Sequence, residues 1–318
     1  MTDLTPILQA VRQASVLCRR VQETHFVRSE KGANDPVTIA DYGAQIIIQR
    51  AVSQHFPEDA IISEEQSSQF LEILNDEQRV EILRLLSDIL GENITQEDAV
   101  RWLDQGSGRT TTRTWVIDPV DGTKGFIGMR RYSIAVGVLE DGKIVDGILG
   151  SPGHPTPDGL GMIFYTRNGK AFVEPMAGGE TRPIHVSDTS DIVAARVVES
   201  VVPAHADLEQ MARIREAAGI LGDVEQVDSQ EKYAMVASGE ADLYMRLPRS
   251  SKDRHWIWDH AAGTAIVEAA GGKVSDVDGS PLDFSLGTTL ARNQGMVVSN
   301  GHIHERVLEA VQQVRSAT

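Results

Sequence analysis

The stretch WVIDPVDGTKGF, residues 115–126, is the most informative part of this chain of 318 residues. A short apolar run leads into Asp118 and Asp121, three positions apart, with Pro119 between them. Because proline blocks the continuation of a strand, the two carboxylates can converge, and the carbonyl of Val120 can point the same way. Oxygen ligands of this kind suit Mg²⁺, which keeps waters and shares substrate phosphate oxygens. Without a cation, these carboxylates would repel one another.

Gly122 and Thr123 follow directly and predict an anion site beside the carboxylates. We expect a helix-like turn here, because glycine lets the backbone approach a ligand and the first N–H groups of a helix bind anions. A phosphate would then lie between these amides and the metal, and the Thr123 hydroxyl could orient an attacking water. Lys124 either adds positive charge or is an ordinary solvated lysine.

Three more acidic residues lie where helices or strands are expected to begin or end: Asp41, Glu64 and Asp259. Each also has a purely structural interpretation, which the sequence leaves open. Asp41 and Asp259 could cap helices, and Glu64 with Glu65 could form a solvated turn. Together with the two aspartates of the opening stretch, they would instead form one carboxylate site.

The first half of the chain predicts an α+β domain, residues 1–187. Two helices come first, the second over residues 40–54, and a short strand with the sequence AIISEEQ (60–66) follows. Residues 67–113 are charged and predict a helical insertion at the surface. Alternating apolar residues and the turn sequences EDGK (140–143) and RNGK (167–170) then predict an antiparallel meander, with strands at 115–117, 133–140, 143–150, 162–166 and 170–174.

The second half, residues 188–318, alternates strands with helices and therefore predicts an α/β domain. The strand sequences are ARVVES (195–200), ADLYMRL (241–247) and GMVVSN (295–300). Helices are expected at 205–219, from 231 to 238, at 259–272 and at the end of the chain.

Composition and charge exclude several classes of protein. The formal net charge of −16 argues against a partner that is a nucleic-acid duplex, although a small phosphorylated ligand needs only a local positive site. No apolar stretch is long enough to span a membrane, and the first twenty residues lack the pattern of a secretory signal. Cys18 is the single cysteine, so no intrachain disulfide can form, and a reducing, cytoplasmic setting fits best.

Four blocks of sequence resemble the lithium-sensitive, magnesium-dependent phosphatase superfamily that includes inositol monophosphatase, inositol polyphosphate 1-phosphatase and fructose-1,6-bisphosphatase. These blocks are Asp41, SEEQ (63–66), DPVDGT (118–123) and WDHAAGTAIVEAAGG (258–272). The resemblance extends over about residues 35 to 300 and implies a layered αβαβα sandwich. Within the superfamily, the chain looks most like the 3′(2′),5′-bisphosphate nucleotidases. The resembling stretches are DPVTIADYGAQ (35–45), DGTKGF (121–126), VDSQEKYAMVASGEADLYMRLP (227–248), WDHAAG (258–263) and PLDF (281–284).

The resemblance implies a role for each matching residue. Glu64, Asp118, Asp121, Asp259 and the Val120 carbonyl would hold two Mg²⁺ ions, and Asp41 would help to hold a third through water. Asp41 and Thr123 would activate the nucleophilic water. Glu64 is also counted among the catalytic residues. The phosphate to be cleaved would bind at Gly122 and Thr123. The remaining nucleotide would meet Ser229, Lys232 and Arg246, with Asp259 also near the substrate.

Two segments depart from the family pattern. His205 stands near the position of a substrate-binding histidine, but the spacing around it is shifted. The sequence PRSSKDRHWIWD (248–259) replaces a segment that usually carries Tyr and Lys-Ile, so Asp253, Arg254, His255 and Trp256 could reshape the adenine side of the pocket.

The implied activity is removal of the 3′-phosphate from adenosine 3′,5′-bisphosphate (PAP), and also from its 5′-phosphosulfate form (PAPS), by direct in-line attack of a metal-activated water. Inhibition by Li⁺, and a role in clearing PAP from sulfate assimilation with a link to salt tolerance, follow from the same resemblance. A phosphatase of inositol polyphosphates or inositol monophosphate is the first alternative, and a non-catalytic regulator that binds metal or phosphate is the second. The sequence leaves the oligomeric state open, and a monomer is compatible with it.

Overall fold

The computed structural model describes residues 2–28, 36–201, 207–247 and 255–317. The chain begins with two long helices, α1 (Thr5–Arg28) and α2 (Pro36–His55), which pack closely along their lengths. A Cβ atom on Gly43 would lie 2.7 Å from the Leu17 side chain, so the glycine permits the close approach of the two helices. No helix in the described part of the chain is long and apolar enough to cross a membrane.

The segment 67–113 is mostly helical, as predicted, and contains α3 (Ser67–Glu72), α4 (Asp76–Leu90) and α5 (Gln96–Asp104). It ends at Arg113, which begins the strand β2 (Arg113–Asp121). Capping boxes begin α4 and α5, from Asn75 and Thr95 respectively, and satisfy the first N–H groups of each helix. Their inner faces are buried in the same hydrophobic core as α1 and α2. The segment therefore contributes buried side chains to the first hydrophobic core, although it was predicted as an insertion at the surface.

The first sheet has seven strands in sequence order, from β1 to β7. They are β1 (Ala60–Ser63), β2 (Arg113–Asp121), β3 (Ser133–Glu140), β4 (Lys143–Ser151), β5 (Met162–Arg167), β6 (Lys170–Pro175) and β7 (Arg182–Pro183). Only β1 and β2 pair in parallel, and β2 to β6 form the predicted antiparallel meander. The short strand β7, which pairs with β6, was not predicted. The expected hairpin turns have positive φ at both central residues, Asp141-Gly142 and Asn168-Gly169, as a type I′ turn requires.

One local prediction was wrong: Pro119 does not end its strand. β2 continues to Asp121, and its register with β3 shifts between Asp118 and Asp121. Proline has no N–H to donate to the ladder, so the strand continues through a bulge at this point. Because of this bulge, Asp118 and Asp121 do not follow the regular alternation of side chains along a strand.

The second sheet is mixed, with strand order β11-β12-β10-β8-β9. Its strands are β8 (Val197–Ser200), β9 (Val224–Val227), β10 (Leu243–Arg246), β11 (Lys273–Ser275) and β12 (Met296–Ser299), of which β9 and β11 were not predicted. The helices of this half are α7 (Leu208–Ala218), α8 (Glu231–Ala237), α9 (Ala261–Ala269) and α10 (His304–Ser316).

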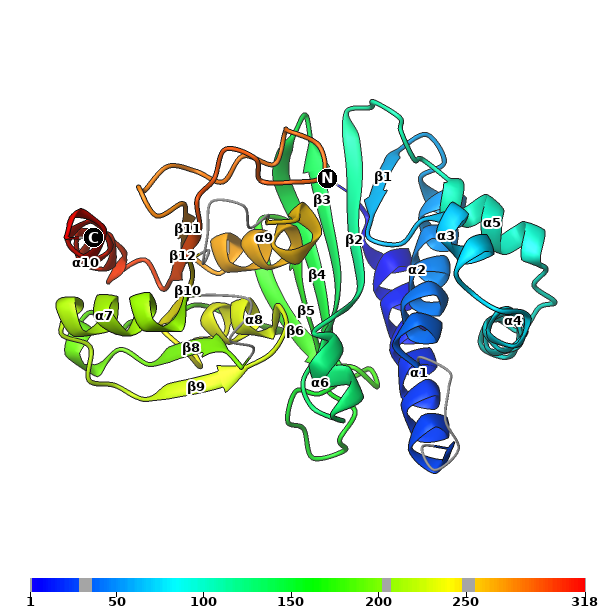
Figure 1. The fold of residues 1–318 in the computed structure, drawn as a ribbon, viewed down its shortest axis with the longest axis horizontal. Helices are drawn as coiled ribbons and strands as arrows, with labels where there is room; N and C mark the ends of the chain where they lie inside the picture. Colours follow the sequence, from blue (N-terminus) through cyan, green and yellow to red (C-terminus); the bar gives the residue numbers. More distant parts are fainter. Residues whose placement is uncertain (1, 29–35, 202–206, 248–254, 318) are drawn as a thin grey trace.

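The layers follow one another as helices, sheet, helices, sheet, helices, which confirms the αβαβα sandwich (Figure 1). α7 and α10 cover the outer face of the second sheet, α8 and α9 lie between the sheets, and α1 and α2 cover the far face of the first sheet. A Cβ atom on Gly137 of β3 would lie 2.7 Å from Cβ of Ala261 in α9. The middle core joins side chains of both halves, such as Phe164 and Ile266. A division near residue 188 stays a prediction.

Candidate active site

The strand ends bring the predicted carboxylates into one region. β1 and β2 run in parallel with Ser63 opposite Ile117, and the N–H of Glu64 donates to the Ile117 carbonyl at 3.3 Å. Glu64 therefore leaves its strand beside Asp118, which is buried. Because parallel strands end at the same edge of a sheet, the two aspartates of β2 and this glutamate belong to the same edge.

Electrostatic effects show that these groups interact. Burial, followed by the charges of Glu64 and Asp121, raises the pKa of Asp118 well above its ordinary value. Burial raises the pKa of Asp121 to about 7, and the nearby carboxylate of Asp259 adds to the effect. Burial also raises the pKa of Glu64 to about 7, with further increases from Glu65 and Asp259. A raised pKa on neighbouring buried carboxylates is the expected result where like charges meet without a cation.

The donor set fits a hard divalent cation. All the candidate ligands offer oxygen, which Mg²⁺ prefers, and Oδ1 of Asp118 is buried without a hydrogen bond within the described residues. Across the ranges that the structure describes, however, no three acidic, histidine or cysteine side chains are already arranged to hold one ion. Asp259 instead meets the guanidinium of Arg246, with Nη1 and Oδ2 3.2 Å apart. A metal ion at Asp259 would therefore compete with this ion pair.

The capping interpretations of two carboxylates were wrong. Asp41 lies inside α2, five residues after the helix begins at Pro36. Asp259 ends the 3₁₀-helix η2 (Ile257–Asp259), and His260 is the N-cap of α9, with no side-chain cap. Neither carboxylate occupies the position from which a side chain caps a helix, so both remain candidates for the site.

The Gly-Thr turn has the predicted helical form. α6 (Thr123–Ile127) begins at Thr123, and Gly122 precedes it with a φ of 94°. This left-handed conformation favours glycine, and a Cβ atom at Gly122 would lie 2.9 Å from Cβ of Ser229. Thr123 and Lys124 are exposed. The turn therefore contacts the start of α8 directly, although 107 positions of sequence separate Gly122 from Ser229.

The start of α8 carries two of the predicted nucleotide-binding residues. Ser229 has a φ of 65°, and its hydroxyl lies 2.9 Å from that of Ser133 on β3. Lys232 is buried and donates from Nζ to the carbonyls of Ser229 at 2.5 Å and Val227 at 3.2 Å. Burial lowers the pKa of Lys232 to about 8, while the charge of Asp121 opposes that shift. The lysine is thus a buried cation held on the side of the candidate site.

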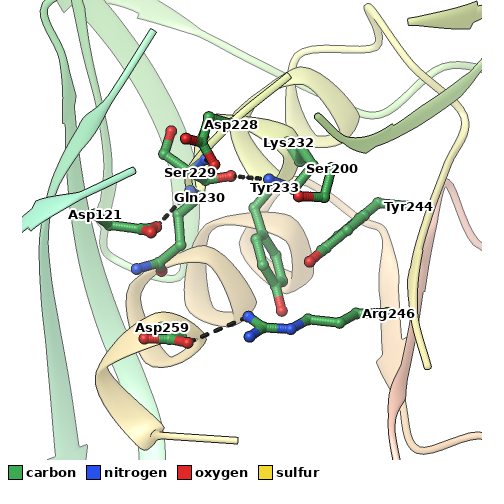
Figure 2. A pocket seen from close by; sticks show the side chains of 10 residues that line it. All are labelled: Asp121, Ser200, Asp228, Ser229, Gln230, Lys232, Tyr233, Tyr244, Arg246 and Asp259. Atoms are coloured by element: carbon green, nitrogen blue, oxygen red, sulfur yellow. Dashed lines mark hydrogen bonds and ion pairs between the residues drawn. The ribbon is translucent and has the colours of Figure 1, made fainter. Parts of the chain in front are cut away.

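A pocket of about 320 Å³, counting space open to solvent, joins these residues (Figure 2). Its walls include five predicted site residues, namely Asp121, Ser229, Lys232, Arg246 and Asp259. Figure 2 shows the Arg246 side chain reaching across the pocket toward Asp259, with Asp121 lying against Gln230. Tyr233 and Tyr244 lie between the two ends of the pocket. The pocket thus combines acidic groups, which could hold a cation, with basic groups, which could hold an anionic ligand.

Five lining residues had not been assigned a role from the sequence: Ser200, Asp228, Gln230, Tyr233 and Tyr244. Gln230 connects several segments: its N–H donates to Oδ2 of Asp121 at 2.6 Å, and its side-chain amide donates to the carbonyl of Trp258 at 2.9 Å. Its side-chain oxygen accepts from the N–H of Gly263 at 3.2 Å. The motif around Ser229 pointed to this region, but residue types alone did not distinguish the glutamine.

The structure describes only part of the two segments that depart from the family pattern. His205, Asp253 and Arg254 lie outside the described residues. His255 is buried, with its ring centroid 5.6 Å from that of His260. Trp256 is 41% exposed and stacks on Trp258, with ring centroids 4.9 Å apart and planes 6° from parallel. An effect of this segment on adenine binding stays a prediction.

Comparison with known proteins gives a consistent result. Residues 3–316 match the Inositol monophosphatase family. Proteins named 3′(2′),5′-bisphosphate nucleotidase are similar over nearly the whole chain: that of Emericella nidulans is 35% identical, covering 96% of each chain. That of Schizosaccharomyces pombe is 34% identical, covering 97% of this chain and 94% of its own.

Solved structures support the fold. An inositol monophosphatase from Anabaena is 22% identical, with a TM-score of 0.60 and complete coverage of both chains. The extragenic suppressor protein suhB from Bartonella henselae is 21% identical, with a TM-score of 0.65, covering 97% of this chain and 98% of its own. At such identities, the likeness concerns the fold alone.

Proposed function

Because this chain belongs to the inositol monophosphatase family, we propose that it is a magnesium-dependent 3′(2′),5′-bisphosphate nucleotidase. It hydrolyses the 3′-phosphate of PAP and releases AMP and inorganic phosphate. The observation that carries this proposal is the 35% identity, over 96% of each chain, with a protein of that name. The pocket supports it, because carboxylates for a cation and buried basic groups for a second phosphate line the same space.

Glu64, Asp118, Asp121, Asp259 and the carbonyl of Val120 are the proposed ligands of two Mg²⁺ ions, with Asp41 near a third. The buried Oδ1 of Asp118, which has no hydrogen bond in the described part of the chain, supports this assignment. When bound, Mg²⁺ lowers the pKa of a coordinated water and neutralises phosphate oxygens. The carboxylates keep the ions at the edge of the first sheet, where β1 and β2 end side by side.

The other site residues orient the substrate and the water. Asp41 and Thr123 accept and hold the proton of the attacking water, and the amides of Gly122 and Thr123 bind the 3′-phosphate. Lys232 and Arg246 meet the 5′-phosphate and Ser229 the nucleoside. Arg246 contacts Asp259 in the structure. An incoming phosphate therefore replaces this carboxylate as the partner of the guanidinium. This exchange leaves Asp259 available as a ligand.

Hydrolysis proceeds by direct in-line attack, without a covalent enzyme intermediate. No cysteine or histidine is among the described residues that line the pocket. Cys18 is buried in the core with α1 and α2, and burial raises the pKa of its thiol, so it is a poor nucleophile. A water held by carboxylates and Thr123 is the nucleophile that fits this pocket.

The decisive experiment is phosphate release from PAP, with inositol 1-phosphate and inositol 1,4-bisphosphate tested beside it, each with and without Mg²⁺. Fast, Mg²⁺-dependent release from PAP alone supports the proposal. Release only from an inositol phosphate would overturn the assignment of Ser229, Lys232 and Arg246 while leaving the metal site intact. PAPS in the same assay measures the preference between the two nucleotides.

Asp41→Asn separates the enzyme from a non-catalytic binder on the same fold. An enzyme loses turnover in this variant, whereas a binder retains its affinity for metal and phosphate. Inhibition by Li⁺ is a further proposal, tested by adding millimolar LiCl to the Mg²⁺-supported reaction. Undiminished turnover at that concentration would contradict it. A cytoplasmic location and a role in sulfate assimilation stay predictions.

A further inference from the structure

Glu231, the first residue of α8, is completely buried and faces an imidazole and a guanidinium from the other half of the chain. Its Oε1 lies 3.0 Å from Nδ1 of His154 and 3.3 Å from Nη1 of Arg131. A buried carboxylate is strongly unfavourable unless donors or positive charges compensate it. We name these three residues the Glu231 cluster.

The partners of Glu231 belong to segments that pack against the Gly-Thr turn. A Cβ atom on Gly125, in α6, would lie 1.9 Å from the carbonyl oxygen of Arg131. A Cβ atom on Gly153 would in turn lie 2.7 Å from Cα of Arg131, so the segment with His154 rests on the same backbone. Arg131 and the segment that carries His154 are therefore supported by backbone contacts that continue to the Gly-Thr turn.

On the other side, Glu231 is connected to the predicted nucleotide-binding residues. Its N–H donates to the hydroxyl of Ser229 at 3.2 Å. Lys232 follows in the chain, and its ammonium is held by the Ser229 carbonyl. A shift of Glu231 would therefore move both residues within the pocket that they line.

Two further glutamates, outside the Glu231 cluster, contact its members from the solvent side. They allow exposed carboxylates to be compared with the buried Glu231. Glu225 lies 3.2 Å from Nη2 of Arg131, and Glu240 lies 3.8 Å from Nε2 of His154. Their side chains are 54% and 43% exposed, respectively. Exposed ion pairs contribute little, so we expect the buried Glu231 to contribute more than either exposed glutamate.

We propose that Glu231, Arg131 and His154 are positioning residues that hold the start of α8 so that Ser229 and Lys232 meet the nucleotide part of the substrate. The proposal rests on the proposed function. It predicts a specific defect in nucleotide binding, whereas a purely structural cluster would affect all activities of the enzyme through stability.

The test uses Glu231→Gln, which removes the charge and keeps the shape. The KM for PAP and the inhibition constant of the product AMP should both rise by about tenfold, the loss expected for a charge-assisted hydrogen bond. The inhibition constant of the other product, inorganic phosphate, should change by less than about twofold, as should kcat, because the cleaved phosphate is proposed to bind the amides of Gly122 and Thr123 and not Ser229 or Lys232. Arg131→Met should act alike, and the double variant should be no worse than either single variant, because the pair acts as one unit.

Glu240→Gln is the matched control, since it removes an exposed carboxylate that contacts His154 of the cluster. It should leave the KM for PAP, kcat and the inhibition constants of AMP and phosphate unchanged. If Glu231→Gln does not fold, Arg131→Lys takes its place, because it keeps the charge but loses the planar guanidinium contact. An unchanged AMP inhibition constant in the folded variant overturns the proposal. Equal weakening of AMP and phosphate, or a fall in kcat alone, also overturns it.

Failure of the proposed function is detected separately, on the wild-type enzyme alone. If wild type cleaves inositol 1-phosphate and not PAP, the variants are compared with that substrate, and inositol replaces AMP as the organic product. A selective rise in the inositol inhibition constant then supports the Glu231 cluster as a positioning device, and its absence overturns it.

Discussion

The backbone N–H of Gln230 donates to Oδ2 of Asp121 at 2.6 Å and so joins the second half of the chain to the carboxylate edge of the first sheet. The Gln230 side chain continues this connection to the carbonyl of Trp258 and the N–H of Gly263. One residue therefore contacts the segments that carry two proposed metal ligands, Asp121 and Asp259. We therefore expect the separation of those two carboxylates to be sensitive to substitution of Gln230.

Gln230→Ala should lower turnover by about tenfold and the free energy of unfolding by about 1 to 2 kcal/mol, because the buried N–H of Gly263 and the partly buried carbonyl of Trp258 lose their partners. Steady-state kinetics and urea unfolding measure the two effects. Gln226→Ala, at an exposed position on β9, is the matched control and should change neither quantity. Wild-type kinetics in Gln230→Ala would show that the side chain does not set the separation of the carboxylates.

Lys232→Ala should raise the KM for PAP by about thirtyfold while kcat changes little, because the lysine contacts the bound nucleotide and not the reacting bond. Lys273→Ala is the control: Lys273 is 48% exposed and pairs with Glu305 at the surface. An unchanged KM in Lys232→Ala would remove this residue from the nucleotide site. The result also separates a nucleotidase from an inositol phosphatase.

The pH dependence of kcat/KM should reveal Lys232 as well. Burial lowers its pKa to about 8, with Asp121 opposing the shift. Above that pH the free enzyme loses the ammonium charge, so kcat/KM for PAP should fall as the pH rises through about 8. In Lys232→Met the fall should disappear. A fall of the same size in that variant would assign the titration to another group.

Asp118→Asn should abolish Mg²⁺-dependent turnover and yet stabilise the metal-free protein by about 1 kcal/mol. Its carboxylate is buried beside Glu64 and Asp121, so removal of one negative charge relieves repulsion. Thermal unfolding in EDTA and in excess Mg²⁺ measures both parts. Wild type should gain about 2.7 kcal/mol at a Mg²⁺ concentration one hundred times Kd, and the variant less. A metal-free variant less stable than wild type would contradict the charge argument.

His304 should make the protein less stable in mild acid. Its buried ring lies 2.9 Å from the Ser275 hydroxyl and 2.8 Å from the Ser299 hydroxyl, and burial lowers its pKa to about 4. An unfolded histidine has a pKa of about 6.5, so between these values the unfolded chain binds more protons than the folded one. The free energy of unfolding should therefore fall as the pH falls from about 6.5 to about 4, by up to about 3 kcal/mol.

Urea unfolding across that pH range tests the effect of His304. His304→Gln should flatten the slope between pH 6.5 and 4. His302→Gln, at an exposed neighbouring position, is the control and should leave the slope as in wild type. An equal slope in His304→Gln would assign the acid sensitivity to other groups.

Local patterns were sufficient for most of the fold. The Asp-Gly and Asn-Gly turns predicted the hairpins of the meander, because only a few residue types accept positive φ at both central positions. The short strands β9 and β11 were missed, since three or four residues carry too little periodicity to be distinguished from a loop. Pro119 was misjudged for a related reason: whether a proline ends a strand or sits in a bulge depends on the neighbouring strand.

The sequence alone was enough to predict the chemistry of the site, because residue types and short spacings decide which ligands a segment can offer. Asp118, Asp121, Gly122 and Thr123 are close neighbours in the chain, so their motif could be recognised without a fold. Contacts between distant segments depended on how the layers pack. Gln230 against Asp121, Arg246 against Asp259, and Glu231 between His154 and Arg131 arise because α8 and α9 are placed between two sheets. Such contacts leave no periodic trace in the sequence, since they follow from tertiary packing and not from local backbone preference.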